Sequence, residues 1–406
     1  MRLVWMKAGK LLPVDTGGKI RSYHIFRNLA QRHDATLLSY YIGPRDVAYE
    51  RALTDQFPGA VCVPIRSGGA LGEALHFASR LPRSAPYAVA KHADPHVRDA
   101  LARVIAERNP DVIVCDFLAA SMNMAGVHGL PTVLFQHNVE SALWRRQAKH
   151  ERHPAKRALF RVEAAKMARY ERRALDRFDR IVAVSEHDKS LMTAMSPHSK
   201  ITVVPTGVDV AHFRRPSMDA SSAPTVMFLG SMDWPANADG VEYFCADIWP
   251  RIAAAVPGAR FQVVGRNPSA RVQALASDSV EIVGGVTSVL PHLHAASVFV
   301  VPLRIGGGTR LKIYEAMAAG LPIVSTSVGA EGLDFTDGRD IVIADDADAF
   351  VRATVDLLRD PVRRAAVSAA AVQTAELFDW SQISLAFDAL LERTCDEHAG
   401  SDTVLT

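Results

Sequence analysis

The sequence predicts an α/β protein built from two doubly wound, Rossmann-like parallel sheets. Short apolar runs rich in β-branched residues alternate with helical periodicities, and fully apolar strands of this kind are typical of parallel sheets. Glycine turns follow several of these runs, where a strand leads into a helix. With 406 residues, the chain is also too long for one ordinary hydrophobic core. We therefore expect two domains of similar architecture.

The composition is that of a globular protein without a dedicated nucleic-acid surface. Apolar residues make up 49% of the chain and charged residues 22%, and the net charge is +2. The four cysteines lie far apart without a CxxC spacing, which argues against a zinc site or a disulfide framework. No run of about 18 apolar residues occurs, and the first apolar run is too short for a signal peptide. We expect a cytoplasmic protein without a membrane-spanning helix.

The first half of the chain carries the pattern of the first sheet. The expected strands are residues 2–6, 35–41, 60–65, 111–115, 132–135, 181–184 and 201–204. Helical periodicity covers 20–31 and 95–108, and a further helix is expected after Pro44. Ligands of doubly wound sheets bind beyond the carboxyl ends of the strands, so the residues that follow each strand are the candidates for a site.

Two of these strand-end loops carry candidate residues. Gly17 and Gly18, with Lys19, lie between a strand and a helix, where a phosphate or a sugar could approach the backbone closely. A plain tight turn explains the glycine pair equally well. His137 directly follows a predicted strand and could bind a sugar hydroxyl or handle the proton of an acceptor. A single histidine is more often structural, but its position makes His137 the best candidate in this half, with Asp116 as a weaker one.

Residues 144–180 are predicted to be helical and are strongly basic, with thirteen Lys or Arg against five Asp or Glu. Attraction to anionic lipid is one interpretation, and it would suit a lipid-linked acceptor and a peripheral location at the inner face of a membrane. A solvated helical face whose apolar side packs on the core explains the segment at least as well. Both interpretations stay open.

A stretch rich in Pro, Ser and Ala at 214–224 carries no apolar periodicity and marks the expected domain boundary. We expect the first domain at 1–215 and the second at 216–378. A final helix and a polar tail, predicted to be disordered beyond residue 398, occupy 379–406. Strands of the second domain are expected at 225–229, 260–264, 280–283, 298–303 and 322–328, and glycine turns follow them.

The segment 298–334 carries the strongest functional pattern. Its strand is followed by three glycines and then by a helix expected at 309–319. The backbone N–H groups of Gly307, Gly308 and Thr309 and the positive end of the helix would point at one spot, which favours an anion. A glycine turn on a solvated helix is the simpler explanation of a lone triplet. The second strand and glycine turn that follow the helix favour the functional interpretation.

Charged side chains on this helix indicate what the anion is. Arg310 and Lys312 oppose the helix dipole in the first turn unless a negative group lies nearby, and their pairing therefore indicates a diphosphate. Glu315, one turn further along, is suited to accepting hydrogen bonds from the two hydroxyls of a ribose. Together these residues predict a nucleotide diphosphate site.

Six motifs occur in order along most of the chain: VDTGGKIRSYHIFRNLA, QHNVES, IVAVSEHD, VVPTGVD, FLGSMDWPANADGVEYF and GGGTRLKIYEAMAAGLPIVSTSVGAEGL. Together they resemble the family 4 glycosyltransferases, retaining enzymes of the two-domain GT-B fold. The resemblance implies that the two Rossmann-like domains face a cleft, with the acceptor-side domain first and the nucleotide-sugar domain second. It also implies that Gly17, Gly18 and Lys19 contact the donor or the acceptor, and it supports His137.

The chain departs from the resembled family in two ways. In many members an Arg and a Lys follow the first strand of the second domain and hold the diphosphate, whereas this chain has Ser-Met-Asp at 231–233. Arg310 and Lys312 are then the obvious suppliers of positive charge. The family also often has two glutamates eight positions apart. Glu315 matches the second, but the first would fall at Gly307, which leaves the donor sugar open.

Our leading hypothesis is a metal-independent, retaining glycosyltransferase that moves a sugar from a nucleotide diphosphate sugar to an acceptor hydroxyl, in polysaccharide or glycolipid assembly. The acceptor would be a saccharide or lipid-linked, and no cofactor is expected, because no DxD-like acidic pair follows a strand. His137 would orient the donor sugar, and Arg310 and Lys312 would stabilise the departing diphosphate. Loss of the Arg310 side chain is expected to lower turnover about 100-fold.

Two other functions are compatible with the pattern. A nucleotide-sugar epimerase of the same fold would need strong acid/base carboxylates in the cleft, and fewer are present than expected. A non-catalytic nucleotide-sugar-binding protein would bind the donor without releasing nucleotide diphosphate, and the two glycine loops with the cationic pair argue against it.

Overall fold

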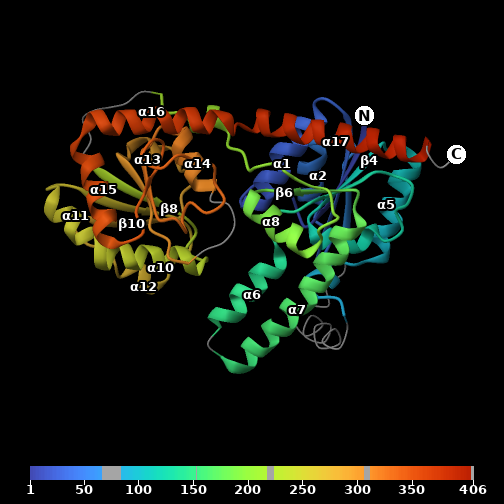
Figure 1. Cartoon of the computed structure of the whole chain (residues 1–406), viewed down its shortest axis with the longest axis horizontal. Helices are drawn as coiled ribbons and strands as arrows, with labels where there is room; N and C mark the ends of the chain where they lie inside the picture. Colours follow the sequence, from blue (N-terminus) through green and yellow to red (C-terminus); the bar gives the residue numbers. More distant parts are fainter. Residues whose placement is uncertain (66–83, 152, 217–223, 306–310, 404–406) are drawn as a thin grey trace. The chain divides into compact units, whose positions relative to one another are not determined.

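The computed structural model describes residues 1–403 apart from 66–83, 152, 217–223 and 306–310 (Figure 1). The chain divides into two compact units. Unit 1 comprises Met1–Pro205 and Ile383–Thr406, and unit 2 comprises Thr206–Gln382. Each unit contains one parallel β-sheet with helices packed against it.

Unit 1 is built on a seven-stranded sheet of order β3-β2-β1-β4-β5-β6-β7, in which every neighbouring pair is parallel. The strands are β1 Arg2–Ala8, β2 Asp34–Ile42, β3 Val61–Ile65, β4 Val112–Asp116, β5 Thr132–Phe135, β6 Arg180–Ala183 and β7 Ile201–Val203. The described helices are α1 Gly17–Ala30, α2 Val47–Gln56, α4 Tyr87–Ala90, α5 Pro95–Arg108, the 3-10 helix Leu118–Met124, α6 Glu140–His150, α7 Pro154–Arg177 and α8 Glu186–Met195.

Unit 2 is built on a six-stranded parallel sheet of order β10-β9-β8-β11-β12-β13. The strands are β8 Thr225–Leu229, β9 Arg260–Val264, β10 Val280–Gly284, β11 Val298–Val301, β12 Ile323–Ser325 and β13 Val342–Ile343. The described helices are α9 Val210–Phe213, α10 Pro235–Tyr243, the π-helix Phe244–Ile248, α11 Trp249–Ala255, α12 Ala270–Gln273, α13 Leu290–Ala295, α14 Leu311–Ala318, α15 Ala347–Arg359 and α16 Pro361–Leu377. The last helix, α17 Trp380–Thr403, begins in unit 2 and continues in unit 1.

The doubly wound fold predicted from the sequence is confirmed in both units. In each sheet the chain starts in the middle, winds outward to one edge and then returns to fill the other side. The strand order therefore reverses between β1 and β4 in unit 1, and between β8 and β11 in unit 2. Ligands of such sheets bind beyond the carboxyl ends of the strands at this reversal, so each unit offers one such position.

An aromatic cluster fixes the later part of α17 in unit 1. The ring of Trp5 on β1 lies 5.8 Å from Phe26 of α1, 5.9 Å from Phe135 of β5 and 5.5 Å from Phe387 of α17, measured between centroids. All four side chains are fully buried. Aromatic residues of this size contribute much of the energy of a core, so the cluster explains why α17 belongs to this unit from Ile383 onward.

The division between the units falls at Pro205, upstream of the boundary expected at 215. The N–H of Val208 donates to the carbonyl of Phe378 at 2.8 Å, and the N–H of Trp380 donates to the carbonyl of Val208 at 3.1 Å. A Cβ on Gly207 would come within 2.6 Å of the Trp380 ring, so glycine permits this close approach. These long-range contacts hold 206–213 in unit 2, while most of the predicted linker lies outside the described residues.

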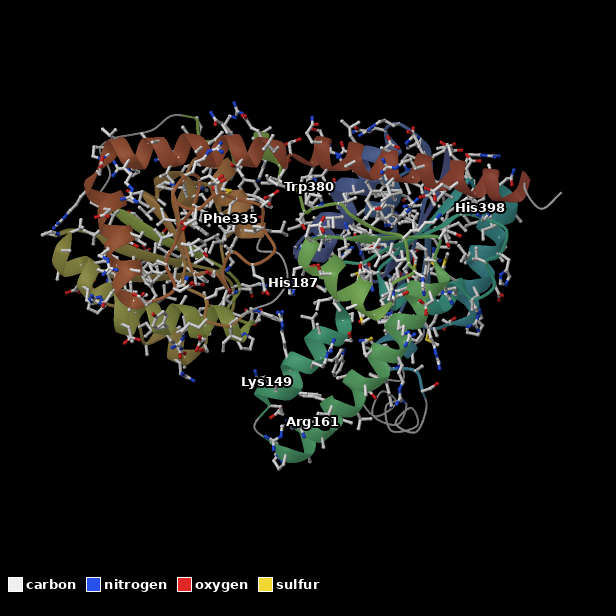
Figure 2. All side chains as sticks on the ribbon, viewed as in Figure 1. Lys149, Arg161, His187, Phe335, Trp380 and His398 are labelled. Atoms are coloured by element: carbon white, nitrogen blue, oxygen red, sulfur yellow. The ribbon has the colours of Figure 1, made fainter. Side chains whose placement is uncertain are left out.

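The basic segment 144–180, predicted as one helical stretch, is two helices that lie side by side and are joined by a short connection (Figure 1). α6 ends at His150 and α7 begins at Pro154. Proline disfavours helical geometry in the residue before it and suits the first turn of a new helix, which explains the break. We call this pair the α6–α7 hairpin. Figure 2 shows Lys149 and Arg161 on its part that extends beyond the sheet.

The disordered tail predicted beyond residue 398 is wrong at its start, because α17 continues to Thr403. No proline interrupts this stretch, and the single Gly400 costs a helix only about 1 kcal/mol relative to alanine. The helix therefore continues five residues past His398 before the described part of the chain ends.

Candidate functional site

The strand reversal of unit 1 brings together the ends of β1, β4 and β5. Lys7 comes from β1, Asp116 ends β4 and His137 follows β5. Lys7 and His137 line a cavity of about 390 Å³, together with Gly18 and Lys19 of α1, and Asp116 lies buried behind them. His137, Gly18 and Lys19, which the sequence proposed as site residues, line this one cavity.

Asp116 is the electrostatic centre of this group. Its side chain is fully buried, and its Oδ2 accepts hydrogen bonds from the Trp5 indole at 2.9 Å and from the Lys7 ammonium at 3.2 Å. Its Oδ1 lies 3.0 Å from Nε2 of His137. Burial alone would raise the pKa of the Asp116 carboxyl, but Lys7 and His137 outweigh burial and hold this pKa well below its usual range. Asp116 is therefore a buried carboxylate at neutral pH.

His137 is held as a neutral ring. Burial lowers the pKa of its imidazole, and the opposing effect of Asp116 is smaller. The ring stacks on Phe117 at 5.1 Å between centroids and meets Phe135 edge-on at 4.5 Å. Because the carboxylate of Asp116 favours a proton on Nε2, Nδ1 is left as an acceptor. A Cβ on Gly18 would lie 3.2 Å from this Nδ1, so Nδ1 faces the start of α1.

The glycine turn before α1 is connected to the same group. Gly17 is the first residue of α1, and the N-cap residue Thr16 makes no side-chain capping bond. The Lys7 ammonium donates to Ser22 Oγ at 2.9 Å, and Ser22 Oγ donates to the Gly18 carbonyl at 2.9 Å. Lys19, in contrast, donates to Asp15 within its own turn at 2.9 Å. The start of α1 is thus tied to Asp116 through Lys7 and Ser22.

In unit 2, glycines follow or end the three neighbouring strands β8, β9 and β10. Gly230 follows β8, Gly265 follows β9 and Gly284 ends β10. A Cβ on Gly265 would come within 1.8 Å of the Gly230 carbonyl oxygen, so the two loops pack backbone against backbone. Four predicted residues of the next loop, namely Gly307, Gly308, Thr309 and Arg310, lie outside the described residues.

Lys312 lies at the strand reversal of unit 2. Its ammonium donates to Asn237 Oδ1 at 3.0 Å and sits 4.3 Å from the centre of the Phe228 ring. A Cβ on Gly230 would be only 2.7 Å from Nζ. Asn237 is itself held by a bond from its amide to the Ser231 carbonyl at 2.7 Å. A positive charge therefore stands at the end of β8.

Glu315 lies one helical turn after Lys312 on α14. Burial raises the pKa of its carboxyl to about 7, although Lys312 acts in the opposite direction. The carboxyl therefore titrates near neutral pH rather than near its ordinary value of 4.5. Only its ionised form accepts hydrogen bonds with both oxygens, as the predicted ribose contact requires.

Replacing Glu315 by glutamine is expected to change how stability depends on pH. Between pH 4.5 and about 7 the folded protein holds a proton on this carboxyl that the unfolded chain has released. The unfolding free energy of the native protein should therefore fall as the pH rises through this interval, whereas glutamine does not titrate. Urea unfolding at pH 5, 6, 7 and 8 should show Glu315→Gln gaining stability relative to the native protein. A constant difference, as expected for the exposed control Glu281→Gln, would contradict this.

Three polar residues near these positions were not predicted. Lys7 is the second-to-last residue of the apolar strand β1, and the rule that strand ends carry the site could have identified it. Asn237 on α10 carries no sequence signal. Arg266, which follows β9, lies 3.3 Å from Ser231 Oγ and 3.6 Å from Asp233. The cation beside the Ser-Met-Asp loop at 231–233 is thus Arg266, which follows the neighbouring strand β9. Only the order of strands in the sheet shows that these two loops are neighbours.

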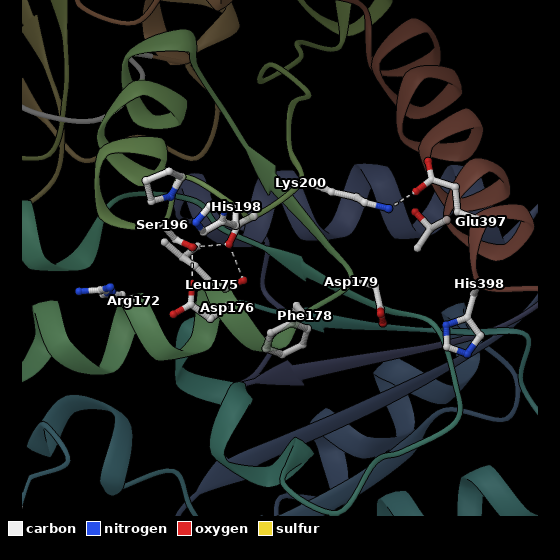
Figure 3. Close-up of a pocket in the computed structure, with 13 residues that line it drawn as sticks. Arg172, Leu175, Asp176, Phe178, Asp179, Ser196, His198, Lys200, Glu397 and His398 are labelled. Atoms are coloured by element: carbon white, nitrogen blue, oxygen red, sulfur yellow. Dashed lines mark hydrogen bonds and ion pairs between the residues drawn. The ribbon is translucent and has the colours of Figure 1, made fainter. Parts of the chain in front are cut away.

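A second cavity of unit 1, of about 530 Å³, has a structural role (Figure 3). It lies beside the amino ends of β6 and β7, away from the strand ends at which ligands of this fold bind. Lys200 pairs with Glu397 of α17 at 2.5 Å, and Ser196 bonds to Asp176 of α7. These polar groups satisfy one another and connect α17 to the sheet.

Among the described residues, no group of three or more His, Cys, Asp or Glu side chains has an arrangement that could hold a metal ion. In the same part of the chain, every helix is either too short or too polar to cross a bilayer.

Comparison with known proteins identifies both halves of the chain. Residues 17–212 match the family described as Glycosyltransferase Family 4, and residues 223–360 match the family described as Glycosyl transferases group 1. The chain is 30% identical over 191 residues to the phosphatidyl-myo-inositol mannosyltransferase of Mycolicibacterium smegmatis, covering 45% of this chain and 49% of that protein. It is 28% identical over 237 residues to the lipopolysaccharide core biosynthesis mannosyltransferase LpsB of Rhizobium meliloti, covering 53% of this chain and 66% of that protein. The chain thus spans about half the length of the first of these relatives.

Solved structures share the whole architecture. Sucrose-phosphate synthase of Thermosynechococcus elongatus superposes with a TM-score of 0.67 at 17% identity, over 97% of this chain and 98% of that chain. Anabaena Alr3699/HepE in complex with UDP superposes with a TM-score of 0.69 at 12% identity, over 97% of this chain and all of that chain. At these identities the likeness concerns the fold alone. The two doubly wound sheets and the two family matches together show that the chain belongs to the family 4 (group 1) glycosyltransferases of the GT-B fold.

Proposed function

We propose that the protein is a retaining glycosyltransferase that moves a sugar from a nucleotide diphosphate sugar to an acceptor hydroxyl. In this reaction the bond between the anomeric carbon and the diphosphate oxygen breaks, and a bond from that carbon to the acceptor oxygen forms. The proton of the acceptor hydroxyl ends on the released diphosphate. The observation that carries the proposal is the ammonium of Lys312 at the end of β8, one helical turn before Glu315.

Unit 2 is the proposed nucleotide site. The departing diphosphate gains negative charge, and fixed positive groups stabilise such charge most when they are already in place. Lys312 is held in place by Asn237. In the sequence it is preceded by Gly307, Gly308, Thr309 and Arg310, whose backbone N–H groups and cation are proposed to bind the same diphosphate. The cations of the chain therefore supply the charge neutralisation in this proposal, and Glu315 binds the ribose.

Unit 1 is the proposed site for the donor sugar and the acceptor. The unprotonated Nδ1 of His137 is suited to accepting a hydrogen bond from a sugar hydroxyl. The buried carboxylate of Asp116 and the stacked Phe117 fix the orientation of this ring. Gly18 and Lys19 line the same cavity at the start of α1, so a sugar bound there would contact their backbone, and Gly17 precedes them in the same turn.

The acceptor is proposed to be a saccharide or a lipid-linked saccharide in polysaccharide or glycolipid assembly. The names of the two mannosyltransferase relatives point to phosphatidylinositol and lipopolysaccharide acceptors. The α6–α7 hairpin supports a lipid-linked acceptor. A groove of about 440 Å³ between its helices is lined by four alanines and by four basic residues, namely Arg145, Lys149, Arg157 and Arg161. No acidic side chain lines this groove among the described residues, and such a surface favours anionic headgroups.

Charge reversal at the hairpin is expected to abolish binding to anionic vesicles. Each basic residue near a membrane surface contributes about 1 kcal/mol, so Lys149→Glu, Arg157→Glu and Arg161→Glu together should lower the partition coefficient at least 100-fold. Sedimentation with phosphatidylcholine vesicles containing 30% phosphatidylglycerol measures it. A matched variant with Arg51, Arg98 and Arg103 changed to glutamate alters the net charge equally. Equal loss in both variants, or no binding by the native protein, would contradict a hairpin contact.

A donor screen tests the function itself. The full chain is incubated with each of a panel of nucleotide diphosphate sugars and a mixture of saccharide acceptors, and released nucleoside diphosphate is measured. The proposal predicts release with one donor class and the sugar recovered on the acceptor with retained anomeric configuration. A new isomer of the nucleotide sugar without acceptor would indicate the epimerase instead, and binding without release would indicate the non-catalytic alternative.

A further inference from the structure

Glu171 is a buried carboxylate in the second half of α7 that has no part in the sites described above. Its side chain is fully buried. Oε1 accepts the N–H of Glu140 at 2.8 Å and the amide of Gln136 at 3.4 Å, and Oε2 accepts the N–H of Ser141 at 3.1 Å. A carboxylate is an acceptor only, so three donors converge on it. All three belong to one turn, residues 136–141, which we call the His137 turn.

The His137 turn connects β5 to α6 and has no capping group of its own. Val139 is the N-cap residue of α6 and makes no side-chain capping bond, so the first N–H groups of α6 would lack acceptors. Glu171 supplies these acceptors from another helix, and its charge lies at the positive end of α6. At the other end of the turn, the N–H of Gln136 donates to the Val182 carbonyl of β6 at 2.9 Å.

The residues that face the cavity lie between two fixed points: the bond from Gln136 to Val182 and the bonds from Glu140 and Ser141 to Glu171. His137 and Asn138 both line the cavity of unit 1 and lie between Gln136 and Glu140 in the chain. The sheet fixes where the turn begins, and Glu171 fixes where it ends. We propose that Glu171 is a positioning residue that sets the orientation of His137 toward the donor sugar. This inference rests on the proposed function, because His137 acquires its role there.

A second buried glutamate on the same helix provides a matched control. Glu163 is 2% exposed, accepts the N–H of Tyr87 at 2.9 Å and pairs with Lys166 at 2.8 Å. It therefore supports the start of α4 with the same chemistry that Glu171 uses at α6. Glu163→Gln removes a buried carboxylate from α7 without a change at the His137 turn.

Steady-state kinetics of Glu171→Gln, Glu163→Gln and His137→Ala in the full chain test the proposal. Glutamine offers one acceptor oxygen and turns an amide toward an N–H donor, so the turn should shift. A misplacement of about 1 Å can cost up to about 100-fold in rate, and we expect Glu171→Gln to lower kcat at least about 10-fold with little change in the donor KM. Glu163→Gln should lower thermal stability without this loss. Adding Glu171→Gln to His137→Ala should lower kcat no further, because the effect acts through His137.

Native kcat in Glu171→Gln, or losses that multiply in the double variant, would overturn the positioning role. A native protein that releases no nucleoside diphosphate from any donor would refute the proposed function instead. In that event a crystal structure of Glu171→Gln decides: a displaced His137 turn supports the proposal, and an unmoved turn overturns it.

Discussion

Replacing Lys312 by alanine is expected to lower kcat about 100-fold, the usual loss when one preorganised donor to a developing negative charge is removed. The ammonium lies at the end of β8, where a Cβ on Gly230 would come within 2.7 Å of it, and it is held there by Asn237. The donor KM should change less than kcat, because the charge that Lys312 stabilises is larger in the transition state than in the bound donor. Measurement of released nucleoside diphosphate under saturating donor gives kcat.

Two further variants make this result specific. Arg310→Ala should reduce kcat by a similar factor, since both cations are assigned to the same diphosphate. Lys189→Ala, a partly exposed lysine of α8 in unit 1, should leave kcat unchanged. If Lys312→Ala turns over donor at the native rate while folding normally, the diphosphate is held elsewhere.

Replacing Asp116 by alanine is expected to destabilise the protein by about 3–5 kcal/mol, the range found when one partner of a buried ion pair is removed. Lys7 is also buried, with its ammonium 3.2 Å from Asp116, and would be left without its counter-charge. The double variant Lys7→Met with Asp116→Ala should recover part of this loss. Urea unfolding of the three proteins at pH 7 measures it, and a loss below about 1 kcal/mol in the single variant would contradict the burial argument.

The low pKa of Asp116 also predicts how the unfolding free energy depends on pH. The pKa of Asp116 is held below its usual range in the folded protein, so the unfolded chain takes up the proton first as the pH falls. The stabilising contribution is complete above the ordinary aspartate pKa, about 3.9, and is lost as the pH falls below it. Native stability should therefore decline more steeply below pH 4 than that of the double variant.

His137, Lys312 and Glu315 could be proposed as site residues from the sequence because each proposal depends only on the local order of strand, turn and helix. A buried strand, then a turn, then a helix determines which side chains stand at a strand end, whichever strands are neighbours. The same rule explains why the predicted bounds of β5, β8 and β9 match the structure. Local patterns of this kind were enough to establish the doubly wound fold.

What the sequence could not supply depends on strands that meet only in the folded chain. Asp116 ranked as a weak candidate because its partners, Trp5 and Lys7, lie 111 and 109 positions away. Arg266 was not predicted as a site residue. Its loop contacts Ser231 only because β8 and β9 pair in the folded chain. The division at Pro205 depends on the same kind of contact, since Gly207 packs against Trp380, 173 positions later.

A crystal structure of the protein grown with the nucleoside diphosphate of its donor tests the central assignment most directly. Our account predicts that the diphosphate lies beyond the carboxyl ends of β8 and β11, within about 3 Å of the Lys312 ammonium, with the ribose hydroxyls on Glu315. A nucleotide bound at any other position, such as the cavity between α7 and α17, would contradict it.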